Sequence, residues 1–141
     1  MLSKMMLKSH EMLDSLMDNF ESSVRNNDAL LVKVSKFNNF KWALINHHSL
    51  EEKTIFFSSD FSDGLSVMAD KLVDDHKIIL SLLDDLESTL SNGDSLDKII
   101  NVLKVLLEQH RNFEDSEFYP LLDDTLDDSQ KELLIGRIKS F

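Results

Sequence analysis

The stretches His48-Ser-Leu-Glu-Glu52 and His110-Arg-Asn-Phe-Glu114 each place a glutamate four residues after a histidine. On an α-helix, residues i and i+4 lie one turn apart on the same face. Each stretch therefore presents an imidazole and a carboxylate to one point in space. Two such pairs indicate helices that hold metal ligands at a shared level inside a bundle.

The composition predicts an all-α protein. The 141-residue chain holds 42% hydrophobic and 29% charged residues, which is ordinary for one globular domain. It contains 3 Gly and 1 Pro. Because Gly and Pro punctuate most loops, so few of them indicate long helices joined by few turns.

Turn-forming residues divide the chain into long amphipathic segments. The expected breaks lie at 26–28, 58–64 and 91–94 and at Pro120. Between them, apolar periodicity predicts helices over residues 4–25, 29–57, 65–91 and 95–118, and a short helix over 129–141. The sequence thus predicts an up-down-up-down four-helix bundle with a short C-terminal helix.

The expected domain is the bundle, residues 1–121, with residues 122–141 as a tail that packs on it. Asp28, and Asp94 or Ser95, are the expected helix N-caps, and Gly93 the expected left-handed C-cap. The acidic run over residues 121–128 is interpreted as a solvated loop.

The charge excludes several classes of function. The net charge of −11 disfavours nucleic-acid binding, because an acidic surface repels phosphates. No apolar run approaches the roughly 20 residues of a membrane span. The N-terminus lacks the features of a signal peptide. Cysteine is absent, which excludes thiolate ligands and disulfides. We therefore expect a cytoplasmic protein.

Two further histidines belong with the His–Glu pairs. His10 and His76 stand on apolar helix faces, as do His48 and His110. At roughly 1.5 Å per residue, the distances from each of the four to the nearest turn agree to within about one turn. The four imidazoles are therefore expected in one layer. Buried carboxylates beside them would be costly unless they bound cations.

A weak internal repeat fixes the choice between adjacent histidines. The stretch from His48 to Ser58 resembles the stretch from His110 to Pro120, with aromatic residues after each glutamate. This alignment selects His48 rather than His47. His47 is then expected at the surface or behind the ligands. The expected place of Glu51 and Glu117 is in solvent, and that of Tyr119 in the packing.

The order of these residues resembles the hemerythrin-like, or HHE cation-binding, family over about residues 5–121. That resemblance implies a four-helix bundle with a non-haem centre of two iron ions and an oxo or hydroxo bridge. It implies a variant with four histidine and two glutamate ligands. The implied metal ligands are His10, His48, Glu52, His76, His110 and Glu114, with the two glutamates as bridges.

One position departs from the oxygen carriers of that family. Those proteins have a second histidine one turn after the first on the third helix, where this chain has Leu80. The resemblance is thus closer to members with four histidines and two glutamates, such as the proteins that repair iron centres. Those repair proteins usually carry a cysteine-containing segment, which this chain lacks.

Three functions remain open from the sequence. The first is a di-iron protein that binds or senses dioxygen or nitric oxide. The second is a di-iron enzyme that handles peroxide or nitric oxide, or donates iron for iron–sulfur cluster repair. The third is a metal-free helical module that binds a partner protein or a second copy. Manganese or zinc would also suit the predicted ligands.

Overall fold

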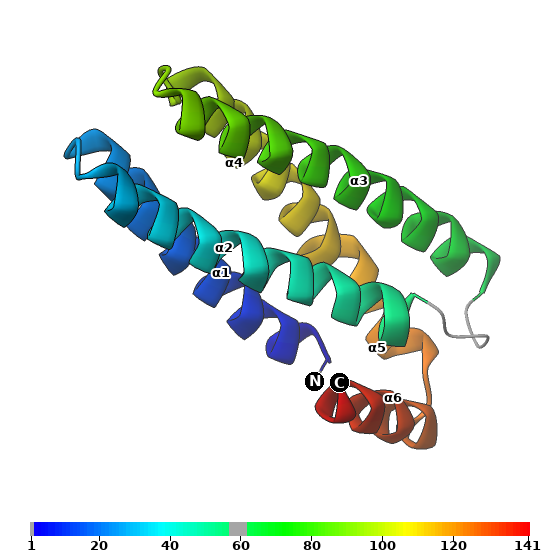
Figure 1. Cartoon of the computed structure of the whole chain (residues 1–141). Helices are drawn as coiled ribbons and strands as arrows, with labels where there is room; N and C mark the ends of the chain where they lie inside the picture. The colour runs from blue at the N-terminus through cyan, green and yellow to red at the C-terminus, as the bar shows by residue number, and fades with distance from the viewer. Residues whose placement is uncertain (1, 57–61) are drawn as a thin grey trace.

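The computed structural model describes residues 2–56 and 62–141, and it forms an antiparallel four-helix bundle (Figure 1). The long helices are α1 (Leu2–Arg25), α2 (Leu30–Leu50), α3 (Asp63–Asn92) and α4 (Asp97–Phe113). α1 packs against α2, and α3 packs against α4 and α2. The predicted all-α bundle is confirmed.

Two of the long helices continue into a π-helical turn. η1 (Glu51–Ile55) follows α2 without a break, and η2 (Glu114–Phe118) follows α4. In η1 the Phe56 N–H donates to the Glu51 carbonyl, and in η2 the Tyr119 N–H donates to the Glu114 carbonyl. Such i→i+5 turns are rare, and they occur often at functional sites.

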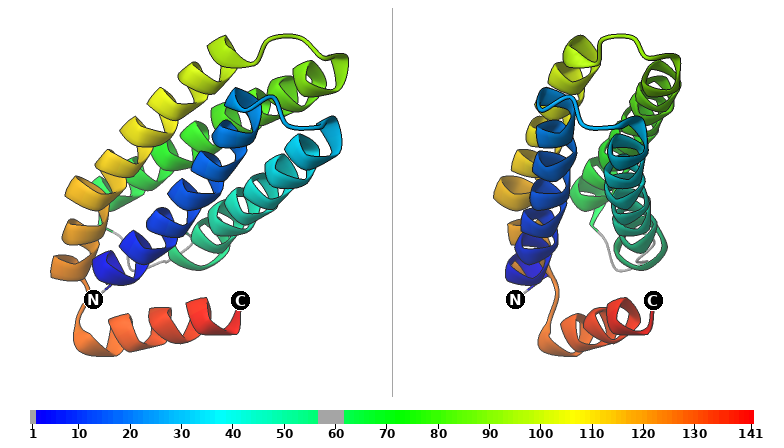
Figure 2. Two further views of the ribbon diagram at one scale, coloured as in Figure 1. Left: turned by 90° about the vertical axis from the view of Figure 1, so that its left-hand side faces the viewer. Right: turned by 60° about the vertical axis from the view of Figure 1, so that its left-hand side comes forward.

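The chain after η2 closes one end of the bundle. α5 (Tyr119–Thr125) continues the direction of α4, and α6 (Asp128–Ser140) lies across the bundle end beside the N-terminus (Figure 2). α6 contacts η1. The predicted boundary between residues 121 and 122 falls within α5. Among the described residues, no helix has the length and apolarity needed to cross a bilayer.

Several local predictions are wrong. Pro120 does not end a helix but lies in the first turn of α5, directly after the π-helical turn η2. The acidic run is largely helical, and the Asp123 carboxylate accepts hydrogen bonds from the Leu2 and Ser3 amides. These bonds tie α5 to the start of α1, which a solvated loop would not do.

The predicted helix caps are confirmed in part. Gly93 is the left-handed C-cap of α3, with φ of 75°. Asp28 and Asp94 or Ser95 do not cap, because α2 and α4 begin after Ala29 and Leu96 with no side-chain cap. Part of the break predicted at 58–64 lies outside the described residues.

The core consists of two apolar clusters with a polar layer between them. One cluster fills the end of the bundle near the α1–α2 and α3–α4 turns, and it includes Phe20, Phe40 and Leu103. The other fills the end closed by α5 and α6, and it includes Leu72 and Phe118. On each long helix, a buried histidine lies between residues of the two clusters.

Candidate metal centre

All five histidines of the chain are buried in the polar layer. His10 lies on α1, His47 and His48 end α2, His76 lies on α3, and His110 lies near the end of α4. Each follows the apolar stripe of its helix into the bundle interior. Of the two positions expected for His47, the one at the surface is wrong, because only 6% of the residue is exposed.

Two fully buried carboxylates lie in the same layer. Glu51 and Glu114 have exposed fractions of 0%, and each is the first residue of a π-helical turn. They stand at i+4 from His47 and His110 and face those imidazoles. The expectation that Glu51 is solvated is therefore wrong. The same expectation for Glu117 is confirmed, since Glu117 is exposed.

Each carboxylate has one oxygen that faces two imidazole nitrogens. Glu51 Oε1 lies 3.3 Å from His47 Nε2 and 3.4 Å from His76 Nε2. Glu114 Oε1 lies 3.3 Å from His10 Nε2 and 3.2 Å from His110 Nε2. Within the described ranges, both oxygens lack a hydrogen bond, as do the Nε2 atoms of His10 and His47. Buried polar atoms without partners are costly, so this cluster is suited to a bound cation.

The donor atoms form two groups that meet at Glu51. One group is His48, Glu51, His76 and His110, and the other is His10, His47, Glu51 and Glu114. Within each group the ligand atoms lie within 4.8 Å of one another. Because Glu51 belongs to both, its carboxylate can join two metal ions held side by side. The two donor groups are therefore adjacent and share one carboxylate.

Two histidines are oriented by acidic partners on their second ring nitrogen. His10 Nδ1 donates to Asp115 at 3.1 Å, and His110 Nδ1 donates to Asp75 at 3.1 Å. These bonds direct each Nε2 lone pair toward the centre when the imidazole is neutral. A carboxylate behind a ligating histidine also makes that histidine more basic.

His47 and His76 have analogous contacts. His47 Nδ1 lies 2.8 Å from Ser9 Oγ, at hydrogen-bond distance. His76 Nδ1 lies 3.4 Å from the Glu52 carboxylate. Glu52 is therefore placed behind a candidate ligand, and its side chain is 37% exposed. Sequence reasoning placed Glu52 in the position that Glu51 occupies.

His48 is placed by ring stacking. Its ring lies parallel to the His76 ring at 3.7 Å between centroids. Burial, and then the nearby charge of His76, lower the pKa of His48 to about 2. The imidazole is therefore neutral, as a metal ligand must be.

The pKa values of the other groups reflect an excess of negative charge. Burial alone would lower the pKa of His10 and His110, but contacts with the surrounding carboxylates, which accept from the rings and attract their positive charge, raise both to about 9. Burial and then the charge of Glu51 raise the pKa of Glu114. Burial would also raise the pKa of Glu51, but the charge of His47, followed by contacts with Glu114 and the nearby imidazoles, holds that pKa well below its usual range. A cation placed here would relieve the repulsion between the two glutamates.

Tyr119 links the two glutamates from the closed end of the bundle. Its hydroxyl donates to Glu51 Oε2 and lies 3.4 Å from Glu114 Oε2. Burial, with the charges of both glutamates, raises the pKa of Tyr119. The neutral phenol thus remains a donor and leaves the Oε1 atoms free to face the imidazoles. Tyr119 is also packed in the core, as expected from the sequence.

The structure brings five of the six predicted ligands into the two groups: His10, His48, His76, His110 and Glu114. It adds His47 and Glu51, which sequence reasoning set aside, and leaves Glu52 outside both groups. A signal for these two residues exists in the sequence. The buried positions 37, 40, 44, 47 and 51 repeat the spacing of 100, 103, 107, 110 and 114.

A model of the hemerythrin HHE cation binding domain matches residues 1–122. The chain belongs to the hemerythrin HHE cation-binding family. The buried histidines and glutamates are consistent with the ligand set of that family. No curated protein and no solved structure matches the chain.

Proposed function

We propose that this HHE-domain protein holds two iron ions in the polar layer and binds a small ligand there, either dioxygen or nitric oxide. The convergence of two donor groups on Glu51 supports the proposal most directly. Imidazole and carboxylate donors suit iron, and they also suit manganese and zinc. The family match favours a cation, and iron is the usual choice.

The residues of the chain divide the work at such a centre. Glu51 and Glu114 would supply negative charge to the bound ions, and the imidazoles would complete the donor set. Tyr119 holds both carboxylates from behind. Asp75 and Asp115 fix the ring orientations of His110 and His10. Reduced iron would supply the electrons that a diatomic ligand accepts on binding.

The surrounding apolar clusters restrict access of water to this layer from the two ends of the bundle. Leu13, Leu44 and Leu107 lie on one side, and Leu72 and Phe118 on the other. A low local dielectric strengthens the interaction between a cation and its carboxylates. It also limits side reactions of a bound ligand with solvent.

A second candidate function is enzymatic handling of peroxide or nitric oxide, or donation of iron. A cavity of about 300 Å³ beside the centre supports this alternative, because a diatomic ligand needs much less space. Among its lining residues are His10, His47 and Glu114. The third candidate, a metal-free interaction module, gives no role to the unpartnered donor atoms.

The deciding experiment is metal analysis of the protein after anaerobic reconstitution with ferrous iron. We expect about two irons per chain and a Mössbauer spectrum of high-spin ferrous ions. Addition of dioxygen or nitric oxide should then change the optical spectrum reversibly. Irreversible oxidation with turnover of peroxide or nitric oxide would favour the enzyme. Failure to take up iron, manganese or zinc would overturn the proposal and favour the interaction module.

A further inference from the structure

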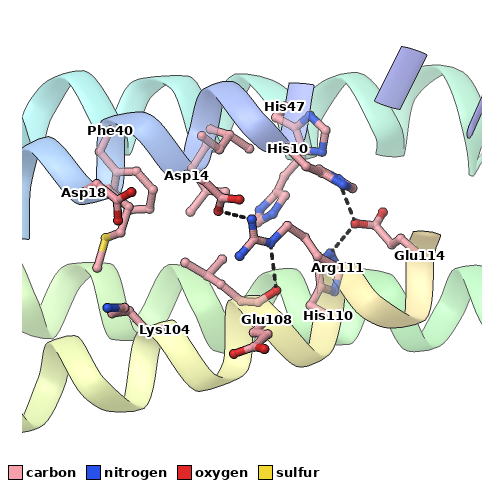
Figure 3. A pocket seen from close by; sticks show the side chains of 15 residues that line it. His10, Asp14, Asp18, Phe40, His47, Lys104, Glu108, His110, Arg111 and Glu114 are labelled. Atoms are coloured by element: carbon pink, nitrogen blue, oxygen red, sulfur yellow. Dashed lines mark hydrogen bonds and ion pairs between the residues drawn. The ribbon is translucent and has the colours of Figure 1, made fainter. Parts of the chain in front are cut away.

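The cavity beside the centre runs between α1, α2 and α4 (Figure 3). At one end of the view lie His10, His47, His110 and Glu114, and toward the other lie Asp18 and Lys104. Asp18 and Glu108 are exposed, whereas the histidines and Glu114 are buried. The cavity therefore connects solvent to the candidate metal centre.

The buried end of this cavity carries unpartnered donors. His10 Nε2, His47 Nε2 and Glu114 Oε1 are buried and have no hydrogen bond within the described ranges. These side chains are more than nine-tenths buried and line the cavity. Their chemistry is that of ligands for a divalent cation.

The solvent end of the cavity has an excess of negative charge. Three carboxylates line it outside the centre, Asp14, Asp18 and Glu108, against the two cations Lys104 and Arg111. Lys104 is already paired with Glu21 at 3.0 Å, and Arg111 is paired with Asp14. The charges of Asp18 and Glu108 are thus left to act on an approaching ion. A cleft lined by one sign of charge raises the local concentration of the opposite ion.

The size of the cavity suits a hydrated ion. At about 30 Å³ per water, 300 Å³ holds roughly ten waters. A divalent cation with six waters needs about 180 Å³ by the same measure, and such cations shed water reluctantly. By volume, the cavity therefore has room for an ion that still carries its waters.

A second cavity, of about 220 Å³, touches the centre from the α2–α3 side. Its charged lining residues are Glu52 and Lys77, which balance each other. Its other lining residues include Ile45, Leu80 and Leu83. The α1–α4 side is therefore the one whose charge attracts a cation.

Arg111 stands within the first cavity, between its two ends. Its guanidinium reaches from α4 to Asp14 on α1, and its Nε donates to the Leu107 carbonyl at 3.4 Å (Figure 3). Burial lowers the pKa of Arg111, although Asp115 and Glu114 oppose that shift. The Arg111–Asp14 ion pair therefore stands across the cavity between its two ends, and a cation must pass it in either direction.

We propose that the cavity between α1, α2 and α4 is the port through which divalent metal ions reach and leave the centre. Asp18 and Glu108 attract the ion, and the Arg111–Asp14 pair forms the barrier that it must pass. This inference rests on the proposed function only in requiring that the centre binds metal. It gives a role to charged residues that hold no ligand position.

The test is the rate of Co²⁺ uptake by metal-free protein, followed by visible absorption of the bound ion. The double variant Asp18→Asn with Glu108→Gln should take up Co²⁺ roughly three- to tenfold more slowly at low salt. The matched control is Asp70→Asn with Asp84→Asn, which removes the same charge from exposed positions on α3. The difference between the two should nearly vanish at about 0.5 M salt, because screening is then short-ranged.

Three outcomes of the uptake measurement would contradict either the port or the proposed metal centre. Equal uptake rates for the two double variants would overturn the port. A lower final Co²⁺ content in the port variant would also overturn it, since that result places the carboxylates in affinity rather than access. Failure of the unmodified protein to bind Co²⁺ would instead count against the proposed metal centre.

Arg111 gives an independent test of the barrier. Arg111→Gln keeps a polar side chain but removes the positive charge and the ion pair to Asp14. Both uptake of Co²⁺ and its release to an excess of chelator should become several-fold faster, with no change in stoichiometry. Unchanged rates in both directions would overturn the role of Arg111, and slower uptake would show that the guanidinium assists the ion.

Discussion

The segments at the ends of α2 and α4 share a backbone conformation and a His–Glu–aromatic spacing, but they differ at the neighbouring positions. Each has a buried histidine, a buried glutamate four residues later that begins a π-helical turn, and an aromatic residue after that turn. In the first segment these are His47, Glu51 and Phe56. In the second they are His110, Glu114 and Tyr119.

The difference lies in the residues one position further along. Glu52 and Asp115 occupy matching positions, and each approaches Nδ1 of a histidine on another helix, His76 or His10. His48 stacks in the centre, whereas its counterpart Arg111 enters the cavity. Adjacent positions on a helix point about 100° apart. The pairs His47–Glu51 and His48–Glu52 are shifted by one residue, so they cannot both point in the same direction. One pair provides the facing ligands, and its neighbour supports them or lines the approach.

The largest expected effect separates Glu51 from Glu52. Glu51→Gln removes the only carboxylate shared by both donor groups in the described structure, so bound metal should fall from two ions to none at micromolar metal. Glu52→Gln should keep both ions with roughly tenfold weaker affinity, the usual effect of losing a group behind a ligand. Metal analysis after gel filtration measures both.

The Glu52 variant is the matched control for charge and side-chain type. Circular dichroism should show both variants helical, since neither substitution removes apolar contacts. Retention of two ions by Glu51→Gln together with loss in Glu52→Gln would reverse the assignment and restore the register expected from the sequence.

The fold was predictable because its causes are local. The long apolar periodicities in a chain with 3 Gly and 1 Pro leave few alternatives to a bundle. The π-helical turns were not predictable in this way, since an i→i+5 turn has no composition of its own. Nor was the helical path through Pro120 predictable, because a proline ordinarily ends or kinks a helix and here follows a π-helical turn.

The sequence predicted a site of buried histidines and glutamates on the four helices, but it did not decide correctly between adjacent residues on α2. The i+4 rule accepts His47 with Glu51 and His48 with Glu52 equally. The aromatic residues after Glu52 in the sequence favoured the second pair, but Phe56 follows the π-helical turn rather than preceding the ligands. The buried residues before the pair, Phe40 and Leu44, have the same spacing to His47 as Leu103 and Leu107 have to His110. The apolar stripe of the preceding helix determines which histidine points into the bundle, so that stripe is the better basis for choosing between the two pairs.

Removal of either His47 or His48 should affect only the ion held by the donor group to which that histidine belongs. His47→Leu leaves one imidazole, His10, in its donor group, whereas His48→Leu leaves His76 and His110 in the other. We therefore expect His47→Leu to bind one ion tightly, and His48→Leu to keep two ions, one with altered spectroscopic parameters. Mössbauer spectra of iron-reconstituted variants measure this. Identical stoichiometry and spectra for the two variants would contradict the division into two groups.

The pH dependence of metal binding tests the carboxylates that surround His10 and His110. Their pKa values of about 9 mean that both rings are in the positively charged, doubly protonated form in the metal-free protein at pH 7.5. A metal ion needs the neutral ring, so binding should release about two protons from these residues and weaken as pH falls. Below pH 9 the affinity should drop roughly a hundredfold per pH unit while both protons are displaced. A pH indicator in weakly buffered solution counts the protons, and no release would contradict the pKa shifts.

The acidic partners of the two histidines should have similar, moderate effects. Asp115→Asn and Asp75→Asn each replace a carboxylate that accepts from Nδ1 of His10 or His110. Each should weaken metal binding about 10- to 100-fold and lower the pKa of its own histidine. Chelator competition gives the affinity, and NMR titration of the metal-free protein gives the pKa. A drop in the pKa of the wrong histidine would contradict the pairing.

The last comparison concerns the aromatic residues that end the two segments. Tyr119→Phe makes the second segment end as the first does at Phe56, and it preserves ring volume in the core. The lost hydroxyl donates to Glu51, and hydrogen bonds to charged groups contribute about 1.5–3 kcal/mol. Urea unfolding of the metal-free protein should show a decrease of about that size. Because the ring still fills its place, the decrease would measure the bond between phenol and carboxylate. A change below about 0.5 kcal/mol would mean that solvent or the neighbouring Glu114 replaces the bond at little cost.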